Sequence, residues 1–402
     1  MYAVPGMSRR PSPQVCDVSL VSWQGTLSQA VGSRARKLTS RRGIVLALHD
    51  RAGHIGLGEA SPLPGWSPDT LEACAQALAA IRDSLPFSER DPQGWPVLPC
   101  LDGSPAARFA FETAFADLWA QTHDEQSGER LGVAQLLGGA MGGASIPLNA
   151  LVASVDEALA AVRAGFSTVK LKIGDSDTAA EKTLLQQVRT AVPPDIALRV
   201  DANGAYGLAA ARNRLATLSD LHLEFVEQPV AAGSSDFLQL SHSPVPLAAD
   251  ESLLFPRERS ALLAGRHAAV WVIKPALYGL RAARDLACLA QQHGIDVVIT
   301  HLFDGPLALR AAQALALSLP KRPRACGLAW HAALWAWPTL AVHGADSLPC
   351  VPALAEQPAA FTGEPSQRAW GPTSLPGHSG AGLGGIDRMG FLTALRESQR
   401  CT

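Results

Sequence analysis

Ionisable residues interrupt several short apolar runs of the chain, in each case at or near the point where the run ends. They are Lys170 and Lys172 in TVKLKIG, Asp201 in LRVDANG, Glu227 in LEFVEQP, Asp250 in LAADES and Lys274 in VWVIKPA. Buried strands rarely tolerate charged side chains without a use for them. Three carboxylates held together would repel one another, and a hard divalent cation with oxygen ligands removes that repulsion. The sequence therefore predicts a Mg²⁺ site, with Mn²⁺ as an alternative, at Asp201, Glu227 and Asp250.

The lysines on either side of these carboxylates predict acid/base chemistry. Lys170 and Lys172 are two positions apart, so a strand places them on one face, and Lys274 belongs to a strand beyond the carboxylates. We expect the cationic surroundings to lower the lysine pKa values toward a range useful for a base. A neutral lysine would then remove a proton from the carbon next to a carboxylate, while the metal ion absorbs the charge of the resulting enediolate.

Taken one at a time, these residues have simpler explanations. A single aspartate at a strand end is at least as often a helix N-cap or a loop residue, and a single lysine is more often solvated. The complete order Lys, Asp, Glu, Asp, Lys is different, because each residue has to fall on the correct one of five consecutive strands. The set as a whole therefore favours a functional site.

The elements that must position these residues repeat along the second half of the chain. Short β-branched apolar runs alternate there with Ala- and Leu-rich amphipathic stretches, as expected for βα units. The eight candidate strands are 146–152, 168–173, 197–203, 223–229, 246–251, 269–275, 296–301 and, weakly, 325–328. They predict an α/β fold, a (β/α)7-8 TIM-type barrel whose strand ends share one mouth. A doubly wound sheet is the alternative, but no GxGxxG loop follows any of these strands.

A different pattern precedes the barrel and predicts an N-terminal α+β capping domain. Its elements are strands at 15–23 and 43–49, a Gly- and Pro-rich loop at 56–66, and helices at 71–85 and 105–121. The resulting division of the chain is a disordered segment at 1–14, the cap at 15–130, the barrel at 140–345, and a segment at 346–402 that returns to the cap.

Composition limits the kinds of partner. The chain has 402 residues, 47% hydrophobic and 17% charged, with 34 Lys+Arg against 36 Asp+Glu. This balance favours a small-molecule partner over nucleic acid or a membrane, and the lysine chemistry described above predicts that this small molecule is a carboxylate. The seven cysteines lack metal-ligand spacing, no run reaches the roughly 18 apolar residues of a spanning helix, and no apolar leader is present, so we expect a cytoplasmic protein. The sequence carries no prediction of oligomeric state.

The motifs KxK, DAN, EQP, DES and KP, in this order, resemble those of the muconate-lactonising subgroup of the enolase superfamily. The segments 56–73 (GLGEASPLPGWSPDTLEA) and 104–121 (SPAARFAFETAFADLWAQ), together with PLNAL in the first strand, are similar to o-succinylbenzoate synthases. The resemblance spans nearly the whole chain.

This resemblance implies a particular reaction. It implies that the three carboxylates are metal ligands, that Lys172 is the acid/base, that Lys170 orients it and stabilises charge, and that Lys274 faces the other side of the substrate. The reaction would be a metal-assisted syn dehydration of 2-succinyl-6-hydroxy-2,4-cyclohexadiene-1-carboxylate through an enediolate. The product would be o-succinylbenzoate, a precursor of menaquinone.

Other members of the subgroup share these strand ends. Racemases, dipeptide epimerases and cycloisomerases are alternatives, in particular an N-acylamino-acid racemase with Lys172 and Lys274 on opposite faces of its substrate. Dipeptide epimerases resemble one another in an Asp-x-Asp near the last strand, where this chain has CGLAWHAALWAW, which argues against an epimerase. That stretch also lacks the polar residue that commonly follows CGL in the synthases. A barrel that binds a carboxylate without turnover is disfavoured, because all five strand ends are intact.

Substrate contacts are predicted near the ends of the third, seventh and eighth strands. The candidates are Asn203, Thr300, Asp304 and Gly327. His301 lies in the same region, but a structural role explains this histidine at least as well.

The cap and the last strand contain further charged and aromatic candidates. The basic stretch 31–43 would attract a dicarboxylate, although we favour a solvated loop; its residues are Arg34, Arg36, Lys37, Arg41 and Arg42. Glu59 is predicted either to brace a loop or to support the site. The tryptophans after the last strand are expected to pack in the core or against the cap; they are Trp330, Trp335 and Trp337.

Overall fold

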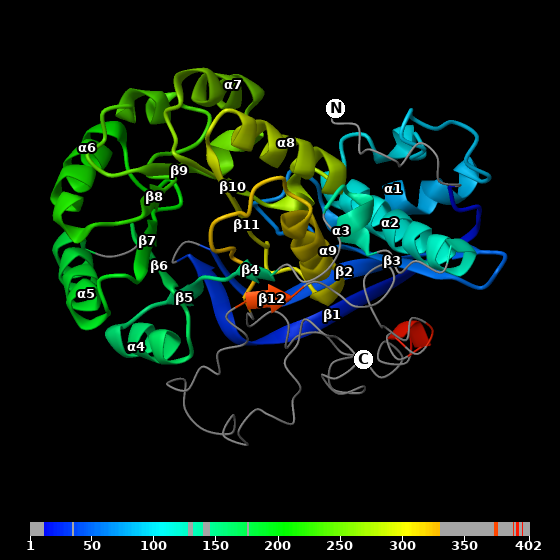
Figure 1. Cartoon of the computed structure of the whole chain (residues 1–402), viewed down its shortest axis with the longest axis horizontal. Helices are drawn as coiled ribbons and strands as arrows, with labels where there is room; N and C mark the ends of the chain where they lie inside the picture. Colours follow the sequence, from blue (N-terminus) through cyan, green and yellow to red (C-terminus); the bar gives the residue numbers. More distant parts are fainter. Residues whose placement is uncertain are drawn as a thin grey trace.

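The computed structural model describes residues 12–33, 36–127, 132–139, 145–174, 177–329, 374–376, 389, 391–393 and 396. It contains an N-terminal cap and a curled parallel sheet surrounded by helices (Figure 1). This arrangement confirms the predicted fold class. Most of the N-terminal segment predicted to be disordered, and most of the segment predicted to return to the cap, lie outside the described residues.

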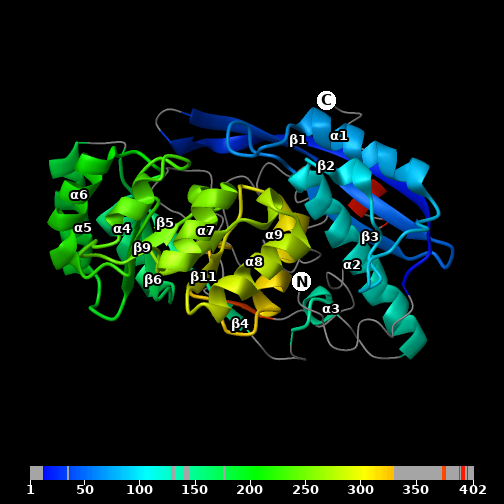
Figure 2. The same cartoon turned by 90° about the horizontal axis from the view of Figure 1, so that it is seen from above.

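The cap is built on a three-stranded antiparallel sheet, in which β2 (Arg36–Asp50) lies between β1 (Val15–Ser33) and β3 (Ile55–Ala60). Helices α1 (Leu71–Ala79) and α2 (Pro105–Ser127) pack against this sheet. β1 and β2 form a long ribbon that extends from the cap toward the barrel elements (Figure 2). The predicted cap strands and helices are confirmed, and both strands are longer than predicted.

The prediction of a loop at 56–66 is wrong for its first part, because β3 occupies these residues. Gly56 and Gly58 lie directly against helix α2. A Cβ atom at these positions would lie 2.0 Å from Ala114 O and 1.9 Å from Ala110 O. Glycine within a strand often marks such a close approach of another backbone, so here it indicates helix-on-strand packing rather than a turn.

The barrel sheet has seven parallel strands in chain order. They are β5 (Ala150–Val152), β6 (Thr168–Lys172), β7 (Ala197–Asp201), β8 (Phe225–Glu227), β9 (Leu247–Ala249), β10 (Val270–Ile273) and β11 (Asp296–Ile299). Cys326 and Gly327 take the eighth position, since Asn149 N donates to Cys326 O and Gly327 N donates to Ile299 O. The weakly predicted eighth strand thus closes the ring through isolated bridges on both sides.

The first predicted strand is divided into two pieces. Its first part, β4 (Ser145–Pro147), pairs antiparallel with β12 (Ser374–Pro376) from the C-terminal segment. Farther along that segment, Phe391 and Leu392 are buried in the main core. The return of the whole segment 346–402 to the cap stays a prediction.

Helices cover the outside of the barrel (Figure 1). They are α4 (Val155–Arg163), α5 (Thr178–Ala191), α6 (Leu208–Thr217), α7 (Pro256–Gly265), α8 (Leu280–Gln292) and α9 (Pro306–Leu317), with α3 (Val133–Leu136) before β4. The 3₁₀ segments among the described residues are η2 (Ala80–Ser84), η3 (Pro99–Leu101), η4 (Ser219–Leu221), η5 (Asp236–Leu240), η6 (Glu251–Leu254) and η7 (Pro275–Leu277). Local sequence fixes several helix starts: Ser154 caps α4, Asp177 caps α5, and a proline begins α7 and α9.

One arginine, which the sequence analysis did not single out, crosses the interior of the barrel. Arg199 on β7 is 1% exposed, and its guanidinium donates to Ala325 O at 2.6 Å and to Glu224 at 2.5 Å. It also lies over the ring of Phe225, 4.7 Å from the centroid. Arg199 therefore ties the eighth position of the ring to the strands opposite it.

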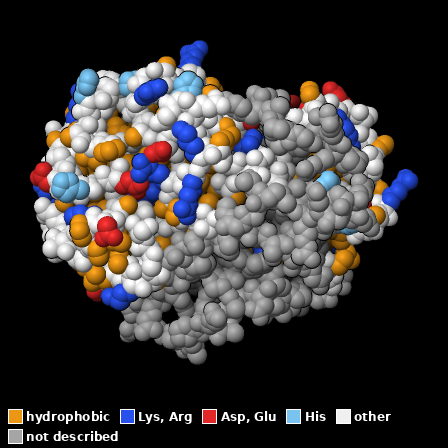
Figure 3. Space-filling view, viewed as in Figure 1, with side chains coloured by type: hydrophobic (Ala, Val, Ile, Leu, Met, Phe, Trp, Pro, Cys, Tyr) orange, Lys and Arg blue, Asp and Glu red, His pale blue; other side chains and the backbone are white. Residues whose placement is uncertain are grey.

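The surface is mixed in character. Acidic and basic side chains are interspersed over the described part of the face in Figure 3. Among the described residues, every helix is too short or too polar to cross a bilayer.

Candidate active site

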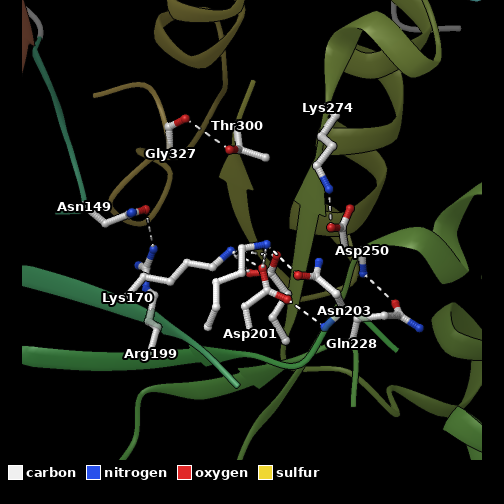
Figure 4. Close-up of polar contacts among 12 residues, drawn as sticks. Asn149, Lys170, Arg199, Asp201, Asn203, Gln228, Asp250, Lys274, Thr300 and Gly327 are labelled. Atoms are coloured by element: carbon white, nitrogen blue, oxygen red, sulfur yellow. Dashed lines mark hydrogen bonds and ion pairs between the residues drawn. The ribbon is translucent and has the colours of Figure 1, made fainter. Parts of the chain in front are cut away.

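The predicted ionisable strand ends come together at one rim of the barrel (Figure 4). Lys172 on β6 is in register with Asp201 on β7, and Asp201 is in register with Glu227 on β8. Asp250 directly follows β9, and Lys274 directly follows β10. Parallel strands place their carboxyl ends at the same edge, which is why residues far apart in sequence meet here.

The lysines and carboxylates contact one another directly. Lys170 Nζ lies 2.9 Å from Asp201 Oδ2 and 2.7 Å from Glu227 Oε2. Lys172 Nζ lies 3.2 Å from the same Asp201 oxygen. Lys274 donates to Asp250 Oδ2. The structure thus joins the flanking lysines to all three carboxylates.

Burial opposes the ionisation of all three carboxyl groups. Asp201, Glu227 and Asp250 are 1%, 2% and 3% exposed. Burial, and then the negative charge of Asp201, raise the pKa of Glu227 to about 7, and burial together with the charge of Glu251 raises the pKa of Asp250 to about 6. Burial opposes ionisation of Asp201 too, but the adjacent lysines outweigh it and lower the pKa of that carboxyl.

The chemistry of these donors fits a hard divalent cation. All three side chains offer oxygen donors on one rim, and burial with neighbouring negative charge raises the pKa values of Glu227 and Asp250 despite the adjacent lysines. In the described ranges, no three His, Cys, Asp or Glu side chains already surround a common point closely enough to hold an ion. The metal site at Asp201, Glu227 and Asp250 therefore stays a prediction.

The predicted lowering of the lysine pKa values is wrong for two of the three lysines. Burial would lower the pKa of Lys170, but contact with Asp201 and Glu227 raises it well above its ordinary value. The pKa of Lys274 is raised in the same way, chiefly by Asp250 against the effect of burial. The sequence argument considered the neighbouring lysines and omitted the carboxylates that contact each of them.

Gln228 is a residue that the sequence analysis missed. Its side chain is buried directly after Glu227, where Oε1 accepts hydrogen bonds from Asp250 N at 3.0 Å and Ser252 N at 3.2 Å. Nε2 donates to Val230 O and to the Ser252 hydroxyl, both at 2.8 Å. One amide therefore holds the backbone of the turn that presents Asp250. The EQP motif contained the signal, since an amide next to a buried carboxylate needs partners of its own.

The predicted substrate contacts lie in different environments. Asn203 Oδ1 accepts a hydrogen bond from Lys172 at 2.5 Å, and the Thr300 hydroxyl donates to Gly327 O at 3.0 Å (Figure 4). Asp304 is 5% exposed and pairs with Arg41 of the cap at 3.9 Å, so this interaction connects it to the cap. Contact of any of these residues with substrate stays a prediction.

His301 is half-buried near the lysines. Burial, followed by the charges of Lys274 and Lys170, lowers the pKa of this histidine to about 3. Its Nδ1 accepts a hydrogen bond from Phe303 N at 2.9 Å. The imidazole is therefore neutral, and its Nδ1 has the structural role that the sequence analysis kept open.

The basic stretch of the cap is not uniformly solvated. Arg42 has a 55% exposed side chain, but Arg41 is 2% exposed, so the prediction of a solvated loop is wrong for Arg41. Glu59 accepts hydrogen bonds from Gly305 N at 2.6 Å and Ala308 N at 3.2 Å, the bracing role that was one of its two alternatives. Arg34, the Arg36 side chain and the three tryptophans from Trp330 to Trp337 lie outside the described residues.

Comparison with known proteins relates both parts of the chain to one group. Residues 153–348 match a family described as enolase C-terminal domain-like, and residues 16–111 match one described as MenC, N-terminal domain. The chain is 33% identical to an o-succinylbenzoate synthase from Desulfotalea psychrophila, over 69% of this chain and 84% of the relative. It is 29% identical to an L-Lys-D/L-Arg epimerase from Methylococcus capsulatus, over 76% of this chain and 88% of the relative.

A solved structure agrees with these sequence matches. The crystal structure of a dipeptide epimerase from Methylococcus capsulatus, complexed with Mg and the dipeptide L-Arg-D-Lys, superposes with a TM-score of 0.66 and 28% identity. The match covers 78% of this chain and 90% of the epimerase.

An α+β cap joined to a barrel, with lysines and carboxylates in contact at one rim, defines the chain as a capped barrel protein whose rim brings acidic and basic groups together. The matches of the cap and of the barrel to known families then identify the family. The chain belongs to the enolase superfamily, in the family that contains the o-succinylbenzoate synthases.

Proposed function

We propose that this enzyme is an o-succinylbenzoate synthase, a carbon–oxygen hydro-lyase. It would convert 2-succinyl-6-hydroxy-2,4-cyclohexadiene-1-carboxylate to o-succinylbenzoate and water. The match of the cap to the MenC N-terminal domain supports this assignment, as does the 33% identity to a synthase. The stretch CGLAWHAALWAW supports it further, because it lacks the paired aspartates expected of an epimerase.

The unequal exposure of the two candidate bases is the observation that carries the proposal. The side chain of Lys172 is 41% exposed, whereas that of Lys274 is 12% exposed and contacts Asp250. A racemisation needs a base with access to each face of the substrate. A syn dehydration needs only one group that acts twice on one face, and the accessible Lys172 suits that requirement.

The proposed step balances within the substrate. Lys172, as a neutral amine, takes the proton from C1, the ring carbon that bears the carboxylate. The same lysine then returns a proton to the hydroxyl on C6, the C6–O bond breaks, and water leaves as the ring becomes aromatic. Lys170 would hold Asp201 and Glu227 in place through its two contacts. Lys274 would lie against the other face of the ring.

Asp201, Glu227 and Asp250 would hold the divalent cation, Mg²⁺ or Mn²⁺. Bound there, the ion supplies positive charge beside the substrate carboxylate, where negative charge accumulates as the proton leaves. The raised pKa values of Glu227 and Asp250 support this placement, because added positive charge would let both carboxyls ionise.

The test is an assay of the purified chain with Mg²⁺ and the cyclohexadiene substrate, followed by the ultraviolet absorbance of the aromatic product. Lys172→Ala should lower kcat by about a thousandfold, while calorimetry still detects Mg²⁺ binding. Lys182→Ala, on the outer helix α5, is the matched control and should keep wild-type kcat. A wild-type protein that forms no aromatic product would reject the proposal.

A racemase or epimerase is the second candidate, favoured by the 29% identity to an epimerase over 88% of its length. Incubation in D₂O with N-succinyl amino acids and dipeptides tests it, because these reactions exchange the α-proton for deuterium. Exchange without aromatic product, lost in both Lys172→Ala and Lys274→Ala, would favour this candidate. No exchange and no product with any of these acids would favour a carboxylate-binding protein.

A further inference from the structure

The β11–α9 loop (300–305) connects the mouth of the barrel with the cap. It begins at Thr300, whose hydroxyl donates to Gly327 O at 3.0 Å where the ring closes. Within the loop, Phe303 has φ 55°, a left-handed conformation that a bulky residue adopts only when its surroundings impose it. The cap supplies much of those surroundings.

Arg41 of β2 holds the middle of the loop. Its buried guanidinium donates to Phe303 O at 3.0 Å and lies 3.9 Å from Asp304. The same group donates to Ser61 O at 2.5 Å and Pro62 O at 3.1 Å within the cap. A guanidinium can satisfy several carbonyls in fixed directions at once, so Arg41 fixes the loop relative to the segment of the cap that directly follows β3.

Glu59 of β3 holds the end of the loop and the start of α9. Gly305 is the N-cap of α9 and has no side chain with which to cap the helix. The carboxylate of Glu59, 1% exposed, accepts instead from Gly305 N at 2.6 Å and from Ala308 N at 3.2 Å. Carboxyl oxygens at this position satisfy N–H groups that the start of a helix leaves free. The capping domain thus supplies the side-chain hydrogen-bond acceptor that the N-cap residue of α9 lacks.

An apolar contact adds to these two polar ones. Leu27 of the β1–β2 ribbon is 6% exposed, and it clusters with Leu38 and Phe303. The ribbon that extends toward the barrel (Figure 2) is therefore seated on the same loop that carries Thr300.

We propose that Arg41 and Glu59 are positioning residues through which the cap sets the place of Thr300, and with it the shape of the mouth beside the seventh strand. They act on substrate affinity through the β11–α9 loop rather than on the proton transfers. The inference rests on the proposed function for the identity of the substrate. The placement of the loop itself does not depend on that function.

Amide hydrogen exchange of the full chain tests the positioning without any substrate. Glu59→Gln places an amide nitrogen against backbone N–H groups, so exchange at residues 300–308 should quicken by about tenfold or more. Asp117→Asn is the matched control: it makes the same change at another buried carboxylate, which accepts from Leu57 N inside the cap. It should leave exchange at 300–308 as in the wild type.

Kinetics with the cyclohexadiene substrate and Mg²⁺ provide the second measurement. Glu59→Gln and Arg41→Lys should each raise KM by about tenfold and keep kcat within about twofold, whereas Asp117→Asn should leave KM unchanged. Unchanged exchange at 300–308, a fall in kcat without a rise in KM, or an equal rise of KM in Asp117→Asn would each overturn the inference. A wild-type chain that forms no aromatic product would reject the proposed function alone, since the exchange comparison would still decide the positioning.

Discussion

Nζ of Lys172 lies 2.5 Å from Oδ1 of Asn203, which follows the end of the neighbouring strand. Asn203 has a left-handed backbone, with φ 44°. Without its amide the lysine can turn away from the reacting carbon, so we expect kcat to fall about tenfold. Asn203→Ala and Asn203→Gly both remove the amide, but only glycine accepts this backbone without strain. Equal losses of kcat would assign the effect to the side chain, and a glycine variant with wild-type kcat would contradict it.

The rim of the barrel could be predicted from sequence because few quantities determine it. A strand period of two puts Lys170 and Lys172 on one face, and parallel topology puts Asp201 and Glu227 on adjacent strands at the same edge. Strand order is therefore enough to bring these residues together. The weak eighth strand is predicted from the βα repeat of apolar runs, and in the structure it depends on bridges from Cys326 and Gly327.

The cap–barrel contacts could not be predicted, because they join segments with no shared local pattern. Arg41 lies in a run of basic residues whose pattern predicts a solvated loop, but it is buried, and one of the carbonyls that accepts its hydrogen bonds, Phe303 O, is 262 positions away in the sequence. The sequence pattern around Gly58 predicts a loop, because it contains no sign that helix α2 packs directly against this glycine. The pKa of Lys170 depends on contact distances, which strand order leaves open.

Arg199 should be essential to the stability of the barrel. In Arg199→Met, Glu224 and the Ala325 carbonyl lose a buried partner, so we expect a destabilisation of about 3–5 kcal/mol in urea unfolding. Arg324 is the control, because it contacts Glu224 as well but has a 44% exposed side chain. Arg324→Met should change the free energy of unfolding by less than about 1 kcal/mol. Similar losses of unfolding free energy in the two variants would show that the buried contacts of Arg199 stabilise the barrel no more than the exposed contacts of Arg324 do.

Glu59 should make stability depend on pH in a defined direction. Burial, and then the charge of Asp304, raise the pKa of Glu59 to about 7 in the folded chain, from an ordinary value of 4.5. The folded state therefore favours the protonated acid, and this stabilisation is complete below pH 4.5 and is lost as the pH rises through about 7. Relative to Glu59→Gln, the wild type should lose free energy of unfolding across this window. Measurements of both proteins between these pH values check the prediction, and a constant difference would contradict it.

A divalent cation should stabilise the folded chain. If Mg²⁺ binds the folded state alone, a concentration of 100 times its Kd adds about 2.7 kcal/mol, seen as a higher Tm that a chelator reverses. Glu227→Gln should remove most of this increment, since it deletes a charged oxygen ligand from the rim. Asp117→Asn, which alters a buried carboxylate inside the cap, should keep it. An undiminished Mg²⁺ effect in Glu227→Gln would place the ion elsewhere.

Gly327 and Thr300 should be energetically coupled, because the space between them is small. A Cβ atom at position 327 would lie 2.3 Å from Thr300 Oγ1, so Gly327→Ala must displace the hydroxyl that now donates to Gly327 O. We expect this variant to lose about 1–3 kcal/mol of stability and to bind substrate less tightly. Thr300→Ala removes the obstructing oxygen, so the double variant should be more stable than the sum of the single losses predicts, by about 1 kcal/mol. Strictly additive losses in urea unfolding would mean that the two positions do not compete for this space.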